Sequence, residues 1–268
     1  MATNSEMSFW DHLEELRWML FRVLICLIIF TLISFIFMPY LFDKVIMAPC
    51  SKDFILYKLI NNFAPSDTLV PDFLIKPFKV DIINIKLASQ FFIHMSLSFE
   101  TALFITFPYL VYEIWKFIYP ALYDNEKSGV KWTFLFGTVM FFLGSFVGYI
   151  IVFPLTLRFL YTYELSSSIT NQLALDSYMS NFIMLIFMMG IIFELPILSM
   201  LFSKMGFLKR SFFSKYRRHA ITAILIVAAV ITPSSDPFTL MVVFIPVYIL
   251  WELSAILVRK DDKDELLE

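Results

Sequence analysis

The strongest constraint on this chain is a series of apolar segments whose lengths approach the thickness of a lipid bilayer. A spanning α-helix needs about 20 mostly apolar residues to cross about 30 Å of hydrocarbon. The candidate segments are 23–42, 87–112, 132–153, 177–203, 220–232 and 238–258. Among the first four, only Glu100 and Glu194 are charged. We therefore predict an all-α, polytopic membrane protein in which residues 1–268 form a single domain of six transmembrane helices.

Composition supports this class and excludes others. Hydrophobic residues make up 59% of the 268 residues and charged residues 16%, whereas soluble domains carry about 25% charged residues. The net charge of −2 and the lack of a dense basic stripe give no support for nucleic-acid binding. Cys26 and Cys50 stand apart as single thiols and do not suggest a disulfide framework. The first apolar segment lacks a small-residue cleavage pattern, so we expect a retained anchor.

Several features predict an irregular helix bundle. The fifth segment has 13 residues, covers about 20 Å as a helix, and should thin the bilayer locally. Prolines at 108, 154, 196 and 246 remove helix amides and favour a curved, concave bundle. Gly144 and Gly148 could let a neighbouring helix approach closely. That helix could belong to a partner protein or, in ordinary internal packing, to this chain. Residues 43–86 are too long for a bare link, and the helical pattern of 52–63 with the extended pattern of 80–87 predicts an external cap.

Charged residues set the expected orientation. Six spans place both termini on one side, which carries fourteen Lys and Arg residues against seven on the other. By the positive-inside rule, the N- and C-termini should be cytoplasmic.

The segment from Ser8 to Leu20 is amphipathic. Ser8 and Asp11 suit a helix start, and the helical spacing of Phe9, Leu13, Leu16 and Leu20 gives an apolar stripe that could rest on a bilayer surface. The acids of the segment, Asp11, Glu14 and Glu15, are open to two interpretations, as partners of the helix dipole or as binding groups.

No catalytic or metal-binding pattern is present in the sequence. His12, His94 and His219 are far apart, and there is no Gly-x-Ser-x-Gly, His-Glu-x-x-His or phosphate-binding Gly-rich motif. We therefore expect no enzyme activity, no metal and no cofactor. Carboxylates inside spans are expensive and suggest function, although Glu100, Glu194 and Glu252 could instead be hydrogen-bonded structural groups or an interfacial anchor.

Two segments carry motifs that resemble one family. Residues 12–17, His-Leu-Glu-Glu-Leu-Arg, resemble the His-Leu-x-Glu-Leu-Arg signature of the TatC family, the signal-recognition subunit of the twin-arginine (Tat) protein translocase. Residues 115–127, from Trp115 to Lys127, resemble its first cytosolic loop. Further matches follow in the same order at Gly190 to Pro196, at Thr232-Pro233 with Asp236, and at Trp251-Glu252.

The resemblance implies six spans, short fifth and sixth helices, cytosolic termini and a concave face. It also implies a non-enzymatic subunit of the bacterial inner (plasma) membrane that binds twin-arginine signal peptides at the cytosolic face. This subunit would organise the export of folded proteins in an oligomeric complex with single-span partners of the TatA and TatB type, using the proton-motive force.

Site residues follow from the resemblance. Those implied for signal-peptide binding are Glu15, Glu126, Phe117, Leu13 and Arg17. Those implied for the cavity and partner contacts are Glu194, Pro196, Asp236, Glu252 and Pro49. The chemistry fits, since two guanidinium groups presented together can each form a bidentate, charge-assisted pair with a carboxylate.

Three positions depart from the family pattern. Met19 stands where many relatives carry a second basic residue, the first external loop is about twice the usual length, and Glu100 occupies a position that is usually uncharged. The alternative function from the residues alone is a secondary transporter of a small molecule or ion, using Glu100 and Glu194 as a relay.

Overall fold

The computed structural model describes residues 9–51, 53–63, 80–118, 130–166, 168, 171–204, 206–232 and 236–258. These residues belong to two compact units. Unit 1 comprises Met1–Met38 and His94–Thr138, and unit 2 comprises Pro39–Ile93 and Val139–Glu268.

Unit 1 is built mainly from two long helices. α1 runs without a break through Phe9–Leu41, so the amphipathic segment and the first apolar segment form one helix. The helix expected in the amphipathic segment is present, and no turn separates it from the first apolar segment. Ser8, the expected helix cap, lies outside the described residues.

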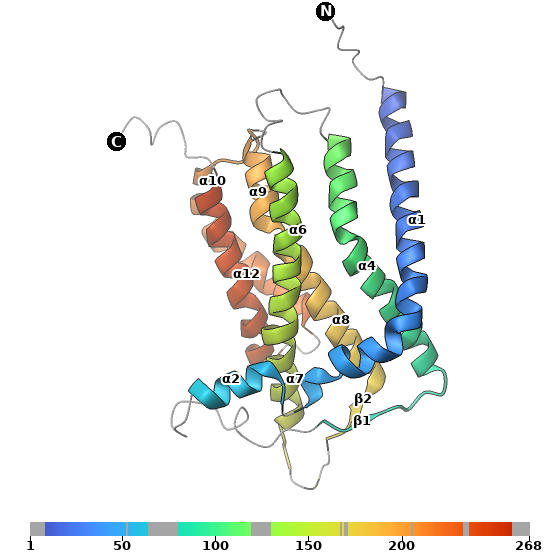
Figure 1. Ribbon diagram of the computed structural model, residues 1–268. Helices are drawn as coiled ribbons and strands as arrows, with labels where there is room; N and C mark the ends of the chain where they lie inside the picture. Colours follow the sequence, from blue (N-terminus) through green and yellow to red (C-terminus); the bar gives the residue numbers. More distant parts are fainter. Residues whose placement is uncertain are drawn as a thin grey trace, which may run out of the picture. The chain divides into compact units, whose positions relative to one another are not determined.

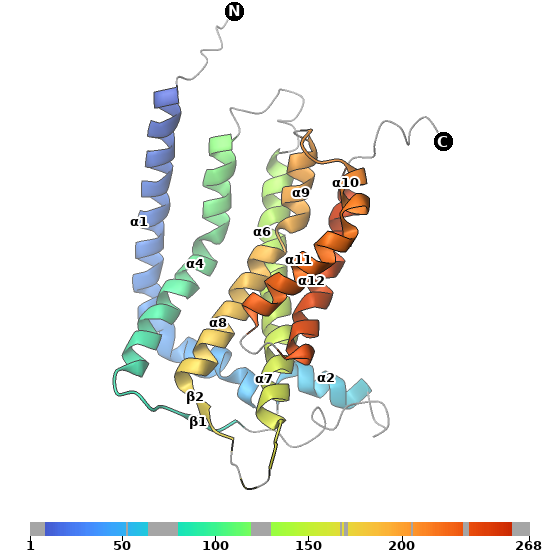
Figure 2. The ribbon, with the colours of Figure 1, turned by 180° about the vertical axis from the view of Figure 1, so that it is seen from behind.

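The second long helix of unit 1 is α4, Ser89–Ile118, which runs antiparallel beside α1 (Figures 1 and 2). A row of small side chains along α4 is buried, including Ser98 and Ala102, both 0% exposed, and Thr106 at 2%. Small residues let two helices approach closely in a membrane, where lipid offers no hydrophobic drive for association.

Among the described residues, unit 2 holds most of the other helices. Its helices from residue 130 onward are α6 Val130–Val147, which begins in unit 1, then η4 Gly148–Val152, α7 Phe153–Thr162, α8 Leu175–Ile192, α9 Leu195–Lys204, α10 Arg210–Lys215, α11 Arg217–Ile231 and α12 Pro237–Leu257. η4 is a π-helical turn that joins α6 to α7. Such turns are rare and occur mostly as single turns inside longer α-helices.

Glycines allow α6 and η4 to pack directly on α8. A Cβ atom on Gly144 would lie 2.5 Å from the Met189 carbonyl oxygen, and one on Gly148 would lie 3.1 Å from the Ile186 Cα atom. On α8, a Cβ atom on Gly190 would lie 2.5 Å from the hydroxyl oxygen of Ser145. The Gly-x-x-x-Gly pair therefore serves packing within the chain.

The first connection contains the two predicted elements. α2 covers Ile55–Phe63, and the extended segment contains β1, Ile82–Ile83, which pairs in parallel with β2, Leu173–Ala174. The short turns η1, Phe42–Ile46, and η2, Ala48–Cys50, follow α1. Tyr57 from α2 donates its hydroxyl toward the carbonyl oxygens of Pro49 and Pro154, at 3.1 and 3.3 Å. This contact holds α2 on α7.

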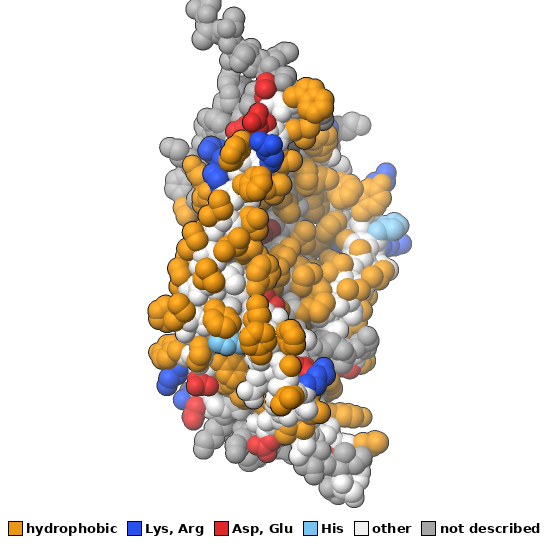
Figure 3. All heavy atoms as spheres, turned by 90° about the vertical axis from the view of Figure 1, so that its right-hand side faces the viewer, with side chains coloured by type: hydrophobic (Ala, Val, Ile, Leu, Met, Phe, Trp, Pro, Cys, Tyr) orange, Lys and Arg blue, Asp and Glu red, His pale blue; other side chains and the backbone are white. Residues whose placement is uncertain are grey.

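Within the described residues, five stretches are long and apolar enough to cross a membrane: Trp10–Ile60, Ser89–Phe117, Leu135–Thr162, Leu175–Ser203 and Pro237–Leu257. Hydrophobic side chains cover most of the face shown in Figure 3, and charged side chains gather mainly toward its two ends. These findings confirm the all-α, multi-pass class. The remaining predicted span, 220–232, lies in α11, whose 15 residues fall short of the about 20 that cross a bilayer.

Candidate functional site

In unit 1, one face of α1 is directed at α4. It carries His12, Glu15, Met19 and Arg22, at helical spacings of three, four and three residues. The His12 ring stacks on the Phe117 ring near the end of α4, with centroids 4.2 Å apart and planes inclined by 22°. Met19 is 6% exposed. The face of α1 that meets α4 is therefore largely polar.

The apolar stripe of α1 points elsewhere. Leu13 is 41% exposed and Leu20 is 57% exposed, as expected for side chains that face lipid rather than another helix. Glu14 and Arg17 are also exposed and form an ion pair at 3.8 Å. Arg17 lies over the Trp18 ring, 5.6 Å from its centroid.

Glu15 is the predicted site residue with the most informative environment. Its side chain is half-buried, and its Oε2 atom is buried without a hydrogen-bond partner among the described residues. A buried carboxylate oxygen without a donor is costly. Glu15 thus offers an acceptor on the same helix face as His12, whose ring contacts Phe117.

The structure brings together some of the predicted binding residues. Glu15 and Phe117 lie at the ends of α1 and α4 that the His12 contact joins, whereas Leu13 and Arg17 point outward. Glu126 lies in 119–129, outside the described residues.

One group was missed by the sequence interpretation. The Glu113 Oε2 atom accepts hydrogen bonds from Arg22 Nε at 3.1 Å and Arg22 Nη2 at 2.7 Å, and its Oε1 atom accepts one from the Tyr109 hydroxyl at 3.0 Å. The Glu113 side chain is 4% exposed. The spacing of Tyr109 and Glu113, one helical turn apart, could have suggested their contact, but nothing local pointed to Arg22.

In unit 2, Glu194 lies in the turn between α8 and α9. Its carbonyl oxygen accepts from the amides of Ile197 and Leu198, both at 3.0 Å, and Pro196 is the second residue of α9. Its Oε1 atom is buried and has no hydrogen-bond partner among the described residues. The helical segment is thus interrupted beside the proline, between the end of α8 at Ile192 and the start of α9 at Leu195.

The other residues implied for this group have structural contacts. Asp236 caps α12, since its Oδ1 atom accepts from the Thr239 amide at 2.9 Å, and Pro49 is buried and accepts from Tyr57. Glu252 accepts hydrogen bonds from Arg217 at 2.7 Å and from the Tyr248 hydroxyl at 2.8 Å. Arg259, seven residues after Glu252 in the sequence, lies outside the described residues.

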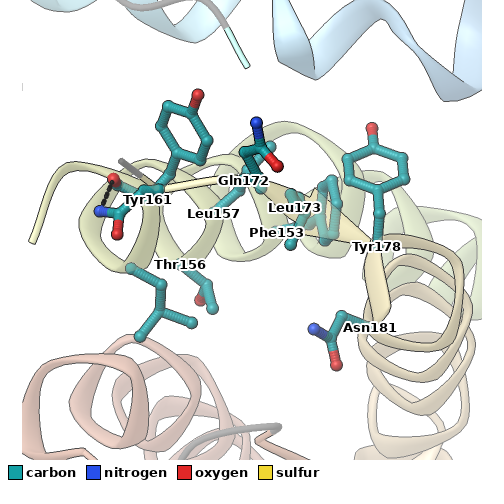
Figure 4. Close-up of a pocket in the computed structure, with 10 residues that line it drawn as sticks. Phe153, Thr156, Leu157, Tyr161, Gln172, Leu173, Tyr178 and Asn181 are labelled. Atoms are coloured by element: carbon teal, nitrogen blue, oxygen red, sulfur yellow. Dashed lines mark hydrogen bonds between the residues drawn. The ribbon is translucent and has the colours of Figure 1, made fainter. Parts of the chain in front are cut away.

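A cavity of about 190 Å³ opens elsewhere in unit 2, between α7, β2 and the start of α8 (Figure 4). Its walls are mainly apolar, including Phe153 and Leu157, with amide groups from Gln172 and Asn181. Glu194 and the other residues predicted to line a cavity are not among its lining residues.

Comparison with known proteins decides the family. The sequence model of the Sec-independent protein translocase protein (TatC) matches residues 11–246, which is most of the chain. The chain belongs to the TatC family. It is 36% identical to the Sec-independent protein translocase protein TatC of Blattabacterium sp. subsp. Periplaneta americana over 252 residues, 94% of each chain. It is 31% identical to TatC of Deinococcus radiodurans over 252 residues, 93% of this chain and 84% of the relative.

Solved TatC structures share the fold. A crystal structure of a twin arginine translocase receptor, TatC, in DDM superposes with a TM-score of 0.73 at 29% identity and covers 92% of this chain and 99% of its own. A second TatC crystal structure gives a TM-score of 0.69 at 29% identity. Membership of the TatC family makes the chain a multi-pass protein of the Sec-independent protein translocase, and this favours the translocase interpretation over a small-molecule transporter.

Proposed function

We propose that this TatC-family chain binds the twin-arginine signal peptides of folded cargo proteins at the cytosolic face of the bacterial inner membrane. Glu15 and Glu126 would each pair with one arginine of the signal, and Phe117 would pack beside them. The TatC receptor structures and the motifs at residues 12–17 and 115–127 support this proposal.

The observation that carries the proposal is the state of Glu15. Its buried Oε2 atom has no donor among the described residues, although the side chain lies on the same face of α1 as His12, whose ring stacks on that of Phe117. An arginine guanidinium supplies several N–H donors in a planar fork that matches a carboxylate. A signal-peptide arginine would therefore satisfy the unpaired oxygen.

A second carboxylate is needed to recognise a pair of arginines. An exposed ion pair contributes only about 0–1 kcal/mol, so one contact would discriminate poorly. Glu126 follows Phe117 by nine residues and is the residue that the family motif assigns to this role. Two charge-assisted pairs in the lower dielectric of the membrane interface would select arginine over lysine, because only arginine forms a bidentate fork.

The orientation belongs to the same proposal. With fourteen cationic residues on the side of the termini and seven on the other, the N- and C-termini are cytoplasmic. Glu15 then faces the compartment from which folded cargo arrives.

Assembly with other subunits completes the proposed role. Single-span Tat subunits of the TatA and TatB type would join this chain in an oligomeric complex in the lipid membrane, without a cofactor. The residues that would serve the cavity and these contacts are Glu194, Pro196, Asp236, Glu252 and Pro49.

The test is photo-crosslinking of a twin-arginine signal peptide, with the photoreactive group beside the arginine pair, to the full chain in membrane vesicles. Glu15→Gln and Glu126→Gln keep side-chain size and remove the charge, so each should reduce crosslinking strongly, and a twin-lysine peptide should crosslink poorly. Glu14→Gln is the matched control, since Glu14 is exposed on the same helical turn. A crosslinking yield that is unchanged by both substitutions and by the twin-lysine peptide would contradict the proposal.

A further inference from the structure

Contacts between α1 and α4 occur at three levels in the described part of unit 1. At one end, the His12 and Phe117 rings stack. At the other end, His94 Nε2 lies 2.9 Å from the Phe35 carbonyl oxygen, and the two rings stack with centroids 4.0 Å apart. The Arg22, Glu113 and Tyr109 group lies between them. Because lipid is as apolar as leucine, such polar and stacking contacts, rather than hydrophobic burial, align two helices in a membrane.

The middle level is the most strongly bonded. Glu113 uses both carboxylate oxygens, one for Arg22 and one for Tyr109, and its side chain is 4% exposed against 39% for Arg22. Charge-assisted hydrogen bonds in a low dielectric are strong. Glu113 is thus occupied within the chain, in contrast to Glu15.

The position of this group relates it to the predicted binding residues. Glu113 precedes Phe117 by four residues, about one helical turn, and Arg22 follows Glu15 by seven residues, about two turns. Since each helix is continuous across these residues, a shift at the middle level moves both binding ends.

We infer that Arg22, Glu113 and Tyr109 form a positioning element that sets the spacing between Glu15 on α1 and Phe117 on α4. We call these three residues the α1–α4 clamp. The effect of the clamp on peptide affinity rests on the proposed function. Its effect on the spacing of α1 and α4 does not depend on that function. The clamp also neutralises Arg22, whose charge would otherwise repel the arginines of a signal peptide two turns away.

The first measurement is the distance between the two helix ends. Spin labels at Glu14→Cys and Lys116→Cys, both exposed positions, report the spacing by electron-electron double resonance after the free thiols of Cys26 and Cys50 are replaced by alanine. Arg22→Gln and Glu113→Gln should broaden the distance distribution. The charge swap Arg22→Glu with Glu113→Arg should narrow it again. Asp53→Asn, which removes the charge of an exposed ion pair in unit 2, should leave it unchanged.

The second measurement is capture of the twin-arginine peptide by the same variants. Arg22→Gln and Glu113→Gln should each weaken peptide capture about tenfold, since members of one hydrogen-bonded network couple strongly. The charge swap should restore most of the capture. Tyr109→Phe removes one hydrogen bond and should give a smaller loss, so it provides a readout if Glu113→Gln does not fold. Asp53→Asn, at an exposed ion pair of unit 2, should bind normally.

The possible outcomes separate the two proposals. Unchanged distance distributions in both single variants would overturn the clamp. A charge-swap variant whose distance distribution stays as broad as those of the single variants would overturn it too. If the unmodified chain does not capture the peptide, the proposed function fails, and the distance measurement still decides whether the clamp exists.

Discussion

Two groups of three residues in this molecule have the same bonding pattern and different surroundings. In unit 1, Glu113 accepts from Tyr109, four residues earlier on α4, and from Arg22 on α1. In unit 2, Glu252 accepts from Tyr248, four residues earlier on α12, and from Arg217 at the start of α11. Both arginine contacts measure 2.7 Å.

The difference lies in burial. The Glu113 side chain is 4% exposed and that of Glu252 is 32% exposed. The helix that carries Glu252 also packs through aromatic rings, with Phe213 4.8 Å from Trp251 and Phe159 4.4 Å from Phe238 between centroids. Ring stacking accompanies both groups, since His12 stacks on Phe117 in unit 1, so burial is what distinguishes them.

Breaking the buried group should have the largest effect. Glu113→Gln removes the charge that Arg22 requires and should lower the free energy of unfolding by about 2–3 kcal/mol, less than for a fully buried pair because Arg22 is partly exposed. Thermal unfolding of the purified chain in detergent micelles measures this loss. A variant as stable as the unmodified chain would show that α1 and α4 do not depend on the clamp.

The next effect tests the close packing in unit 2. Gly144→Ala places a methyl group 2.5 Å from a backbone oxygen and should cost about 2 kcal/mol by overpacking. Gly148→Ala meets its nearest atom at 3.1 Å and should cost about half as much. The same unfolding assay compares the two, and the reverse order would mean that α6 and α8 do not pack as described.

A smaller effect is expected at the partly exposed group. Glu252→Gln should change the free energy of unfolding by at most about 1 kcal/mol. Solvent screens the attraction between Arg217 and Glu252, so little interaction energy is lost when the pair is broken. Comparing the stability losses of Glu252→Gln and Glu113→Gln in the same unfolding assay tests directly whether burial accounts for the difference between the two groups. Equal losses for the two variants would refute that explanation.

The smallest effect belongs to a fully surface pair. Glu14 and Arg17 are 62–63% exposed and 3.8 Å apart, so Glu14→Gln should shift stability by less than about 0.5 kcal/mol. The unfolding midpoint and signal-peptide capture should both match those of the unmodified chain. A clear loss in either would assign Glu14 a role that its exposure does not suggest.

Sequence reasoning predicted the fold class well because the signals it used are local. Segment length and apolarity located the helices, and the β-branched segment before α4 contains β1. The amphipathic pattern of the first segment predicted a helix there, which α1 confirms, but it did not show that the face carrying His12 meets α4. Periodicity reports which side chains share a face, but not whether that face meets lipid, water or another helix.

The candidate site was predicted only in part for a related reason. The family motif pointed to Glu15 and Phe117, and the structure places them at ends of α1 and α4 that contact each other. Glu113 and Arg22 carried no local signal, since they are 91 residues apart in the chain.

The sequence by itself determined that this protein is a helical membrane protein and that its motifs are those of the TatC family, because hydrophobic length and short motifs are properties of contiguous residues. Only the tertiary structure decided that the polar face of α1 meets α4, that Glu113 is paired while Glu15 keeps a buried oxygen without a described donor, and that Gly144 and Gly148 pack on α8. Helix pairing in a membrane depends on the fit of small and polar side chains across an interface, and hydropathy does not encode that fit.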